Sequence, residues 1–201
     1  MRPKLLLATN NAGKVKEFRS LLAGIPFDLV TLKEMGIAMA IEETGATYKE
    51  NAQLKACVLA AQSGLLTLAD DSGLEVAALH GAPGVMSARY AGENASNDER
   101  IAYLLSKLID VPQENRTARF YCVIAIAKPE GTVQFCDGEC RGLIAFTPFG
   151  QQGFGYDPVF YLPEFSKTMA ELPADVKNKI SHRARAAQKA KTLLLKMAQT
   201  A

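Results

Sequence analysis

The order of apolar runs and amphipathic stretches constrains the fold of this chain more than any other feature. Short apolar runs predict buried strands, and apolar residues at helical spacing predict helices between them. The expected strands are 4–9, 27–31, 65–69, 119–127 and 132–144. The expected helices are 14–23, 47–63, 97–109 and 181–199. Strands and helices alternate early and a strand pair comes late, which predicts an α/β fold with a mixed sheet.

Helix boundaries follow from capping residues. Gly64 is placed to end the helix at 47–63, and Pro112 lies just beyond the helix at 97–109. Asn97 and Ser181 are the expected N-caps of the third and last helices.

Length and charge limit the class of protein. The 201 residues suffice for one domain, residues 1–201, with two lobes, and 48% hydrophobic residues exclude a disordered chain. The 23 basic and 21 acidic residues nearly balance, so a nucleic acid is not the expected partner. Apolar runs are too short for a membrane span, and Leu5–Ala8 is too short for a signal peptide. We therefore expect a cytoplasmic protein that does not bind membranes.

Cysteine and histidine usage restricts the metal chemistry. The four cysteines include no C-x-x-C pair, and the chain has only two histidines. A structural zinc site needs four such ligands close together. A catalytic metal is therefore expected to be Mg²⁺ or Mn²⁺, held by carboxylates.

A polar turn follows the first predicted strand. Thr9, Asn10 and Asn11 precede Lys14 at the start of a predicted helix. Unpaired backbone N–H groups and the helix dipole favour an anion at such a turn, and lysine adds a positive charge for phosphate. The alternative is an ordinary capped turn with a solvated lysine.

Two pairs of carboxylates are candidate metal ligands. Glu42 and Glu43 precede a helix, and Asp70 and Asp71 follow a buried strand. Adjacent residues of a strand face opposite ways, so both aspartates reach one ion only if the chain bends at the strand end, which Gly73 permits. The site would bind Mg²⁺ and supply a general base. The alternative is an exposed acidic turn.

Two later segments also suggest a ligand. Gly153 and Gly155 flank Phe154 in a loop that could present an aromatic ring to a flat ligand, although its aromatics could instead pack in the core. His182 and Arg183 open the last helix, where a basic residue opposes the helix dipole.

Taken together, these segments resemble one family, the inosine triphosphate pyrophosphatases or XTP/dITP diphosphatases. The match runs from about residue 4 to residue 183. The motifs that carry it, in order, are Thr9-Asn10-Asn11-Ala12-Gly13-Lys14, Glu42-Glu43-Thr44-Gly45, Glu50-Asn51-Ala52 with Lys55, Asp70-Asp71-Ser72-Gly73, Gly81-Ala82-Pro83-Gly84, Ser87-Ala88-Arg89-Tyr90, Gly153-Phe154-Gly155-Tyr156-Asp157-Pro158 and Ser181-His182-Arg183.

The resemblance implies a fold and an activity. The fold would be α/β, with two lobes around a long mixed β-sheet, flanking helices and an active site in the cleft. The activity would be Mg²⁺-dependent hydrolysis of deaminated purine nucleoside triphosphates (ITP, dITP and XTP) to the monophosphate and pyrophosphate, which clears them from the nucleotide pool. The usual assembly would be a homodimer.

The resemblance also implies residue roles. Asp71 would be the catalytic base. Glu43, Asp71 and Asp70 would form the metal site. The substrate-binding residues would be Thr9, Asn10, Asn11, Lys14, Lys55, Ser72, Phe154, Gly155, Tyr156, Asp157, Lys177, His182 and Arg183. Which of Asn10 and Asn11 contacts phosphate is left open.

Base choice depends on the atom at purine position 6, which is a keto oxygen in ITP and an amino group in ATP. Arg183 is always a donor and His182 can donate, so both are candidates to bind the keto oxygen. If Arg183 serves phosphate or structure instead, the loop of Phe154 would discriminate.

Two other functions remain open at this point. A phosphatase acting on sugar phosphates would release orthophosphate rather than pyrophosphate. A nucleic-acid-binding module would use the basic C-terminal helix, but residues 181–201 contain no aromatic side chain for base stacking.

Overall fold

A computed structural model describes residues 2–38 and 41–199 of the chain. The strands in these ranges are β1 (Lys4–Leu7), β2 (Asp28–Thr31), β3 (Leu66–Val76), β4 (Thr117–Ala127), β5 (Val133–Ile144), β6 (Phe160–Leu162) and β7 (Lys167–Thr168). The α-helices in these ranges are α1 (Ala12–Leu21), α2 (Tyr48–Ser63), α3 (Asn97–Ser106), α4 (Ala174–Ile180) and α5 (His182–Gln199). Short 3₁₀ helices include Gly84–Arg89 and Asp157–Val159.

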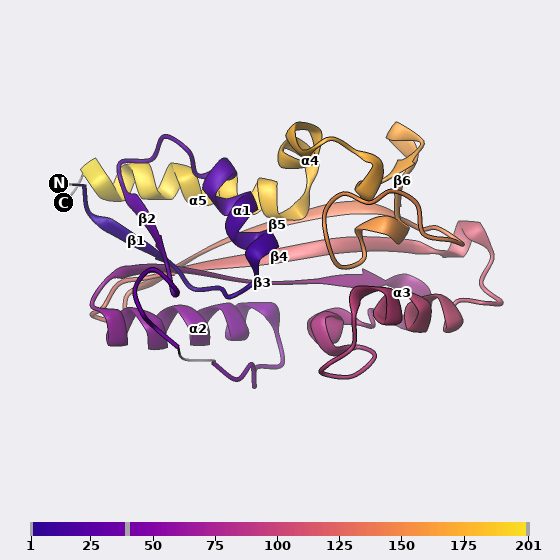
Figure 1. The fold of residues 1–201 in the computed structure, drawn as a ribbon, viewed down its shortest axis with the longest axis horizontal. Coiled ribbons are helices and arrows are strands. Elements are labelled where there is room, and N and C mark those ends of the chain that lie inside the picture. Colours follow the sequence, from indigo (N-terminus) through magenta and orange to yellow (C-terminus); the bar gives the residue numbers. More distant parts are fainter. Residues whose placement is uncertain (1, 39–40, 200–201) are drawn as a thin grey trace. The chain divides into compact units, whose positions relative to one another are not determined.

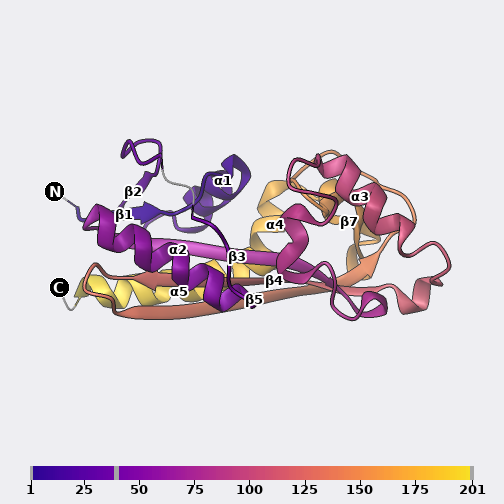
Figure 2. The same ribbon diagram turned by 90° about the horizontal axis from the view of Figure 1, so that it is seen from below.

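The strands form one mixed sheet, which confirms the predicted α/β class. Among the described residues its order is β2-β1-β3-β4-β5-β6-β7. The β1 strand pairs in parallel with both β2 and β3, whereas β6 pairs antiparallel with β5 and β7. The expected hairpin is the β4–β5 pair, whose strands lie side by side (Figure 2).

The chain divides into two compact units. Unit 1 comprises residues 1–71, 122–138 and 183–201, and unit 2 comprises residues 72–121 and 139–182. The chain passes between the units within β3, β4 and β5, and again at the start of α5.

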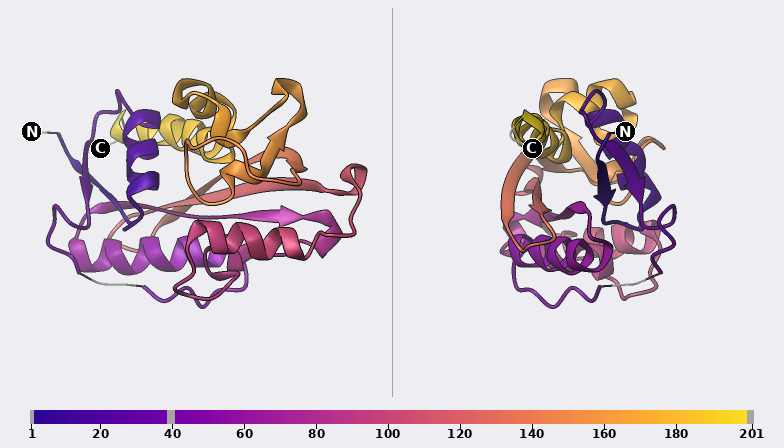
Figure 3. Two further views of the ribbon diagram at one scale, coloured as in Figure 1. Left: turned by 45° about the vertical axis from the view of Figure 1, so that its right-hand side comes forward. Right: turned by 90° about the vertical axis from the view of Figure 1, so that its left-hand side faces the viewer.

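Unit 1 has helices on both faces of its strands. Helices α1 and α5 lie on one side and α2 lies on the other, as Figures 1 and 3 show. Leu5 and Leu7 of β1 pack with Phe18 of α1 and with Ala187 and Leu194 of α5. Burial of this apolar surface holds α1 and α5 against β1.

Unit 2 has a core of its own. Leu74 and Val76 of β3 pack with Leu104 of α3 and with Tyr156 and Phe160. The rings of Phe120 and Phe160 lie 4.4 Å apart between centroids. Tyr156 belongs to this core and therefore anchors the segment 154–157.

Several predicted boundaries differ from the structure. Helix α2 begins after Thr47, whose side chain forms a capping box with Glu50, and it ends at Gly64 in the left-handed region, as expected. The prediction of Asn97 as N-cap was wrong, because Ser96 caps α3 through Glu99. Ser181 has extended backbone immediately before α5, as an N-cap does.

The largest difference concerns β3. The predicted strand ended at residue 69, but β3 continues through Asp70, Asp71 and Gly73 to Val76. The expected bend at the two aspartates is therefore absent. Helix α4 and the short strands β6 and β7 were not predicted.

Candidate functional site

Both aspartates are buried in the middle of β3. Asp70 is 2% exposed and Asp71 is 5% exposed. Because the strand stays extended, neighbouring side chains point to opposite faces. The structure accordingly gives Asp70 and Asp71 different side-chain partners. The strand lacks the bend that would let both aspartates reach one ion.

The carboxylate of Asp70 faces two cations from distant parts of the chain. Lys14 Nζ lies 2.9 Å from Asp70 Oδ2, and the Nε and Nη2 atoms of Arg183 lie 3.4 and 3.3 Å from the same oxygen. Burial alone would raise the pKa of Asp70, but the charges of Lys14, Arg183 and Lys55 outweigh burial and hold that pKa well below its usual range. Asp70 is therefore ionised and ties α1 and α5 to β3.

Arg183 forms ion pairs with two carboxylates of unit 1, those of Asp70 and Glu17. Its Nη1 donates to Glu17 Oε2 at 2.7 Å, and its guanidinium lies 6.0 Å from the centre of the Phe18 ring. The side chain is 2% exposed. These contacts favour the alternative that Arg183 serves the phosphate end of the site or its structure; purine recognition by Arg183 stays a prediction.

The carboxylate of Asp71 faces a second set of groups. Asn51 Nδ2 donates to Asp71 Oδ2 at 3.1 Å, and Lys55 Nζ lies 3.9 Å from Asp71 Oδ1. Burial raises the pKa of Asp71, the charge of Lys55 opposes that effect, and the nearby charge of Glu43 adds to it. The net effect is a raised pKa, which makes the carboxylate a better proton acceptor; the role of Asp71 as the base stays a prediction.

Lys55 lies among the three predicted metal ligands, Glu43, Asp70 and Asp71. Its Nζ lies 2.5 Å from Glu43 Oε1 and 2.7 Å from the Asp70 carbonyl oxygen. Burial lowers the pKa of Lys55, but the charges of Asp71, Asp70 and Glu43 more than offset this and raise it. The lysine is therefore a cation at neutral pH, placed among carboxylates.

Helix α2 also contributes a residue that sequence reasoning did not include in the site. Asn51 lies one turn before Lys55, so both project from one face of the helix. Asn51 Oδ1 accepts a hydrogen bond of 2.8 Å from the backbone of Gly45, and a Cβ at Gly45 would lie only 2.7 Å from that oxygen. Asn51 therefore links the segment after Glu43 to Asp71. The i, i+4 spacing of Asn51 and Lys55 could have indicated this.

Glu17 was also missed. It lies three residues after Lys14 in α1 and contacts Arg183. In contrast, Glu50 serves the capping box of α2, where its Oε2 accepts from the backbone N–H groups of Ala46 and Thr47.

The turn between β1 and α1 has the form expected of an anion site. Asn11 is the N-cap of α1 and accepts a hydrogen bond of 3.0 Å from the backbone of Lys14. Thr9 Oγ1 accepts one of 3.2 Å from the backbone of Asn11, and Asn10 is exposed. The structure therefore assigns Asn11 to the cap; phosphate binding by Thr9, Asn10 and Asn11 stays a prediction.

Unit 2 brings together three of the residues predicted to bind the base. Lys177 Nζ of α4 lies 2.5 Å from Asp157 Oδ2, which also accepts from the backbone N–H of Phe154 at 3.0 Å. The same ammonium lies 4.9 Å from the centre of the Phe154 ring. Gly153 makes this possible, because a Cβ there would collide with Asp157 Oδ2.

The aromatic residues of this segment have different environments. Phe154 is half-buried, and Gly155 beside it has a positive φ of 61°. Tyr156 is buried and its hydroxyl donates to the Ser87 carbonyl at 2.9 Å, so its ring packs in the core; its role in substrate binding stays a prediction. His182 is also buried and stacks on Phe120 at 4.7 Å. Ser72 follows Asp71 in β3 and is half-buried.

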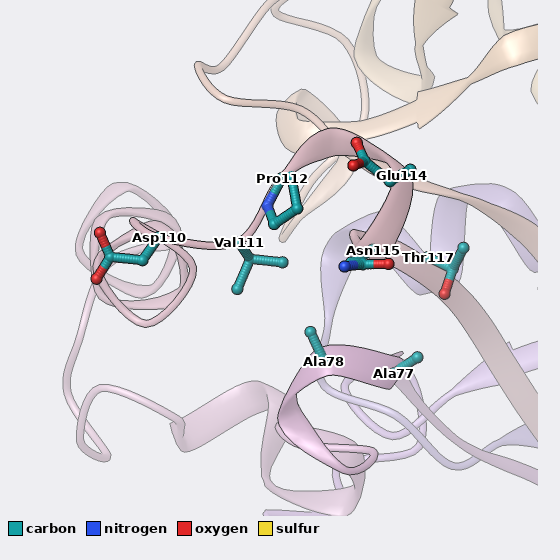
Figure 4. A pocket seen from close by; sticks show the side chains of 8 residues that line it. All are labelled: Ala77, Ala78, Asp110, Val111, Pro112, Glu114, Asn115 and Thr117. Atoms are coloured by element: carbon teal, nitrogen blue, oxygen red, sulfur yellow. The ribbon is translucent and has the colours of Figure 1, made fainter.

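A hollow of about 440 Å³ in unit 2 contains none of the predicted site residues. It is lined by Ala77, Ala78, Asp110, Val111, Pro112, Glu114, Asn115 and Thr117. Figure 4 shows Val111 and Ala78 facing each other across it, with the carboxylates of Asp110 and Glu114 turned away. Because no predicted site residue lines this hollow, the candidate site remains at β3.

The donor set in unit 1 fits a hard divalent cation. Glu43 and Asp71 offer carboxylate oxygens and already share one cation, the ammonium of Lys55. Over residues 2–38 and 41–199, no group of three or more His, Cys, Asp or Glu is positioned to hold a metal. Mg²⁺ is commonly bound by one or two carboxylates together with substrate phosphates. The pair therefore fits a metal completed by phosphate oxygens; Asp70 as a third ligand stays a prediction.

No helix in the described part of the chain is long and apolar enough to cross a membrane.

Comparison with known proteins confirms the resemblance. The sequence profile of the Ham1 family matches residues 5–193. The dITP/XTP pyrophosphatase of Desulforamulus reducens is 52% identical over 95% of each chain, and that of Bacillus subtilis is 47% identical over 94% of this chain and 96% of the relative. A HAM1 protein from Coxiella burnetii has a solved structure with a TM-score of 0.88 and 43% identity, over 96% of this chain and 99% of that chain. The solved structure of the Staphylococcus aureus Ham1 protein has a TM-score of 0.85 and 41% identity, over 95% of this chain and 97% of that chain. The chain belongs to the Ham1 family.

Proposed function

We propose that this chain is a nucleoside-triphosphate pyrophosphohydrolase that converts deaminated purine nucleoside triphosphates to the monophosphate and pyrophosphate. Membership of the Ham1 family supports this, as do the relatives named dITP/XTP pyrophosphatase. The observation that supports the proposal is the partly buried cluster of Glu43, Lys55 and Asp71, in which two carboxylates lie beside one ammonium and the pKa of Asp71 is raised.

The residues of unit 1 act on the phosphates. The N-terminus of α1 and the ammonium groups of Lys14 and Lys55 bind the triphosphate, whose charge they offset. Asp71 accepts a proton from the water that attacks the α-phosphorus, and Asn51 fixes the orientation of its carboxylate through the Oδ2 contact. Positioning and charge stabilisation supply most of the rate enhancement for such a transfer.

Glu43 and Asp71 would hold the divalent cation, Mg²⁺ or Mn²⁺. When bound, that ion offsets the negative charge that develops on phosphate oxygens.

The residues of unit 2 recognise the purine. Phe154 offers a half-buried ring for stacking, and Lys177 is a donor held in place by Asp157. A donor pairs with the keto oxygen of ITP, dITP and XTP and opposes the amino group of ATP. Sites that leave a polar group unpaired reject the wrong substrate by about 10⁴-fold in favourable cases.

The products test this proposal. The protein is incubated with ITP, dITP or XTP and Mg²⁺, with ATP as the comparison, and the products are separated by anion exchange. We expect the monophosphate and pyrophosphate, little reaction with ATP, and no reaction after EDTA treatment. Stoichiometric orthophosphate without pyrophosphate would instead support the sugar-phosphate phosphatase and overturn the proposal.

The assembly and location are part of the same proposal. A homodimer is supported by the resemblance and by the exposed rings of Phe146 and Phe149, which border a hollow of about 470 Å³ in unit 2. Light scattering should give twice the monomer mass, and a fully active monomer would contradict it. The cytoplasm is proposed because it holds the nucleotide pool.

The proposal includes no nucleic-acid or membrane partner. Basic residues of α5 are partly used within unit 1, where Lys189 pairs with Asp137 at 2.9 Å and Lys191 donates to the Ala23 carbonyl. These contacts leave less of the basic face for a phosphate backbone.

A further inference from the structure

The ammonium of Lys55 has the surroundings of a bound metal ion. Three oxygen atoms face it: Glu43 Oε1 at 2.5 Å, the Asp70 carbonyl at 2.7 Å and Asp71 Oδ1 at 3.9 Å. Two of the three belong to carboxylates, and the side chain is only 13% exposed. A cation in a partly buried acidic setting of this kind offsets charges that would otherwise repel each other.

The same two carboxylates are the proposed ligands of the divalent cation. An ammonium between Glu43 and Asp71 and a metal ion bound to both would occupy the same space. Their positive charges would also repel each other at such a distance. Lys55 must therefore leave this position before the metal can be held as proposed.

We propose that Lys55 is an internal competitor of the divalent cation, which fills the metal position in the nucleotide-free protein and moves to the polyphosphate when the nucleotide binds. This inference rests on the proposed function, which supplies both the metal and the polyphosphate. The four-carbon stem of lysine is flexible enough for such a change of partner.

The consequence is an order of binding. Without nucleotide, a metal ion must displace Lys55 from two carboxylates, so its affinity is low. With nucleotide, the phosphates attract the ammonium and leave Glu43 and Asp71 to the metal. Metal and nucleotide then bind cooperatively, and each increases the affinity for the other by the same factor.

Lys14 provides a matched control. It carries the same charge in the same unit, but its ammonium contacts the side chain of Asp70, at 2.9 Å from Oδ2, and the side chains of Asp70 and Asp71 point to opposite faces of β3. Its charge lowers the pKa of Asp71 less than the charge of Lys55 does. Removing Lys14 therefore changes the general electrostatic potential without emptying the position between the carboxylates.

The experiment measures Mn²⁺ binding to metal-stripped, nucleotide-free protein. The signal of free Mn²⁺ in electron paramagnetic resonance gives the Kd for the wild type, Lys55→Met, Lys55→Gln and Lys14→Met. Thermal unfolding of each variant establishes that it is folded, and the two Lys55 variants differ in polarity, so either one can carry the test.

We expect both Lys55 variants to bind Mn²⁺ about tenfold more tightly than the wild type, a change typical of coupling between ligands. We expect Lys14→Met to bind less than about threefold more tightly, because a more distant charge acts through a higher effective dielectric constant. An unchanged or weaker affinity in a folded Lys55 variant would overturn the inference. So would an equal gain in Lys14→Met, because it would reveal a general charge effect.

This result is separable from the proposed function. Release of pyrophosphate from ITP by the wild type with Mg²⁺ tests the function itself. A wild type that releases pyrophosphate while its Mn²⁺ affinity does not respond to Lys55 would overturn only the role of Lys55. A wild type that releases none would overturn the function first.

Discussion

Replacement of Asp70 by asparagine tests how β3 holds the two cations that converge on it. The side chain is nearly isosteric, so packing is preserved while the negative charge is lost. Lys14 and Arg183, at 2.9 and 3.3 Å from Oδ2, then lose their shared carboxylate. Arg183 is itself buried and still contacts the carboxylate of Glu17.

The size of the effect follows from this geometry. Removing one partner of a buried ion pair costs about 3–5 kcal/mol, because it leaves a charge buried without compensation. Since Glu17 remains beside Arg183, we expect the lower end of that range. For a chain of this size, about 3 kcal/mol corresponds to a fall in Tm of roughly 6–12 °C.

Urea unfolding at pH 7 measures the loss of free energy, with Glu17→Gln as the control. The side chain of Glu17 is 13% exposed and that of Asp70 is fully buried, so the loss of Glu17 should cost less than the loss of Asp70. If the free energy of unfolding of Asp70→Asn lies within about 1 kcal/mol of the wild type, the reasoning is refuted. The ion pairs of Asp70 with Lys14 and Arg183 then do not hold α1 and α5 to β3.

The pH dependence has a definite sign. The pKa of Asp70 is lower in the folded protein than in the unfolded chain, so its contribution is present above the ordinary carboxyl pKa and is lost as the pH falls towards the folded value. The stability difference between the wild type and Asp70→Asn should therefore shrink progressively below about pH 4.

Three further predictions concern other parts of the structure. Asp71→Asn should reduce kcat by about 10²–10⁴-fold with little loss of stability, because burial already disfavours its charge; a kcat within threefold of the wild type would exclude it as the base. Lys177→Met should raise KM for ITP and reduce the preference for ITP over ATP, which steady-state kinetics measure as the ratio of the two kcat/KM values. An unchanged ratio would mean that Asp157 and Lys177 are only structural. Thr47→Ala should cost about 1 kcal/mol in urea unfolding by removing the capping box of α2, and no loss would mean that Glu50 compensates.

The early half of the fold was predictable because local rules decide it. The strand is indicated by the apolar run at 4–9, and the helix between Thr47 and Gly64 is indicated by the capping residues at its two ends. Boundaries were less certain where two capping residues adjoin, as at Ser96 and Asn97.

The course of β3 could not be predicted in the same way. Two adjacent aspartates are costly in a buried strand, so the sequence favours a turn there. What offsets the cost comes from elsewhere: Lys14 from α1, Lys55 from α2 and Arg183 from α5. Such long-range compensation is invisible to local patterns.

The candidate site shows the same limit. The resemblance named Asp71, Lys55 and Glu43, and the structure places the three in contact. It gave no role to Asn51, although Asn51 lies in one of the matching motifs, and it did not include Glu17, because their roles depend on which face of α2 or α1 meets the sheet. Arg183 was interpreted from its place at a helix start, whereas its contacts with Asp70 and Glu17 depend on residues far away in the sequence.

The most direct test of the central claim is the fate of the oxygen from water. Hydrolysis of ITP with Mg²⁺ in H₂¹⁸O, followed by mass spectrometry of both products, shows which phosphorus is attacked. Attack at the α-phosphorus by a water that Asp71 deprotonates predicts ¹⁸O in the phosphate of IMP and none in pyrophosphate. Label in pyrophosphate, or release of labelled orthophosphate in its place, would contradict the account.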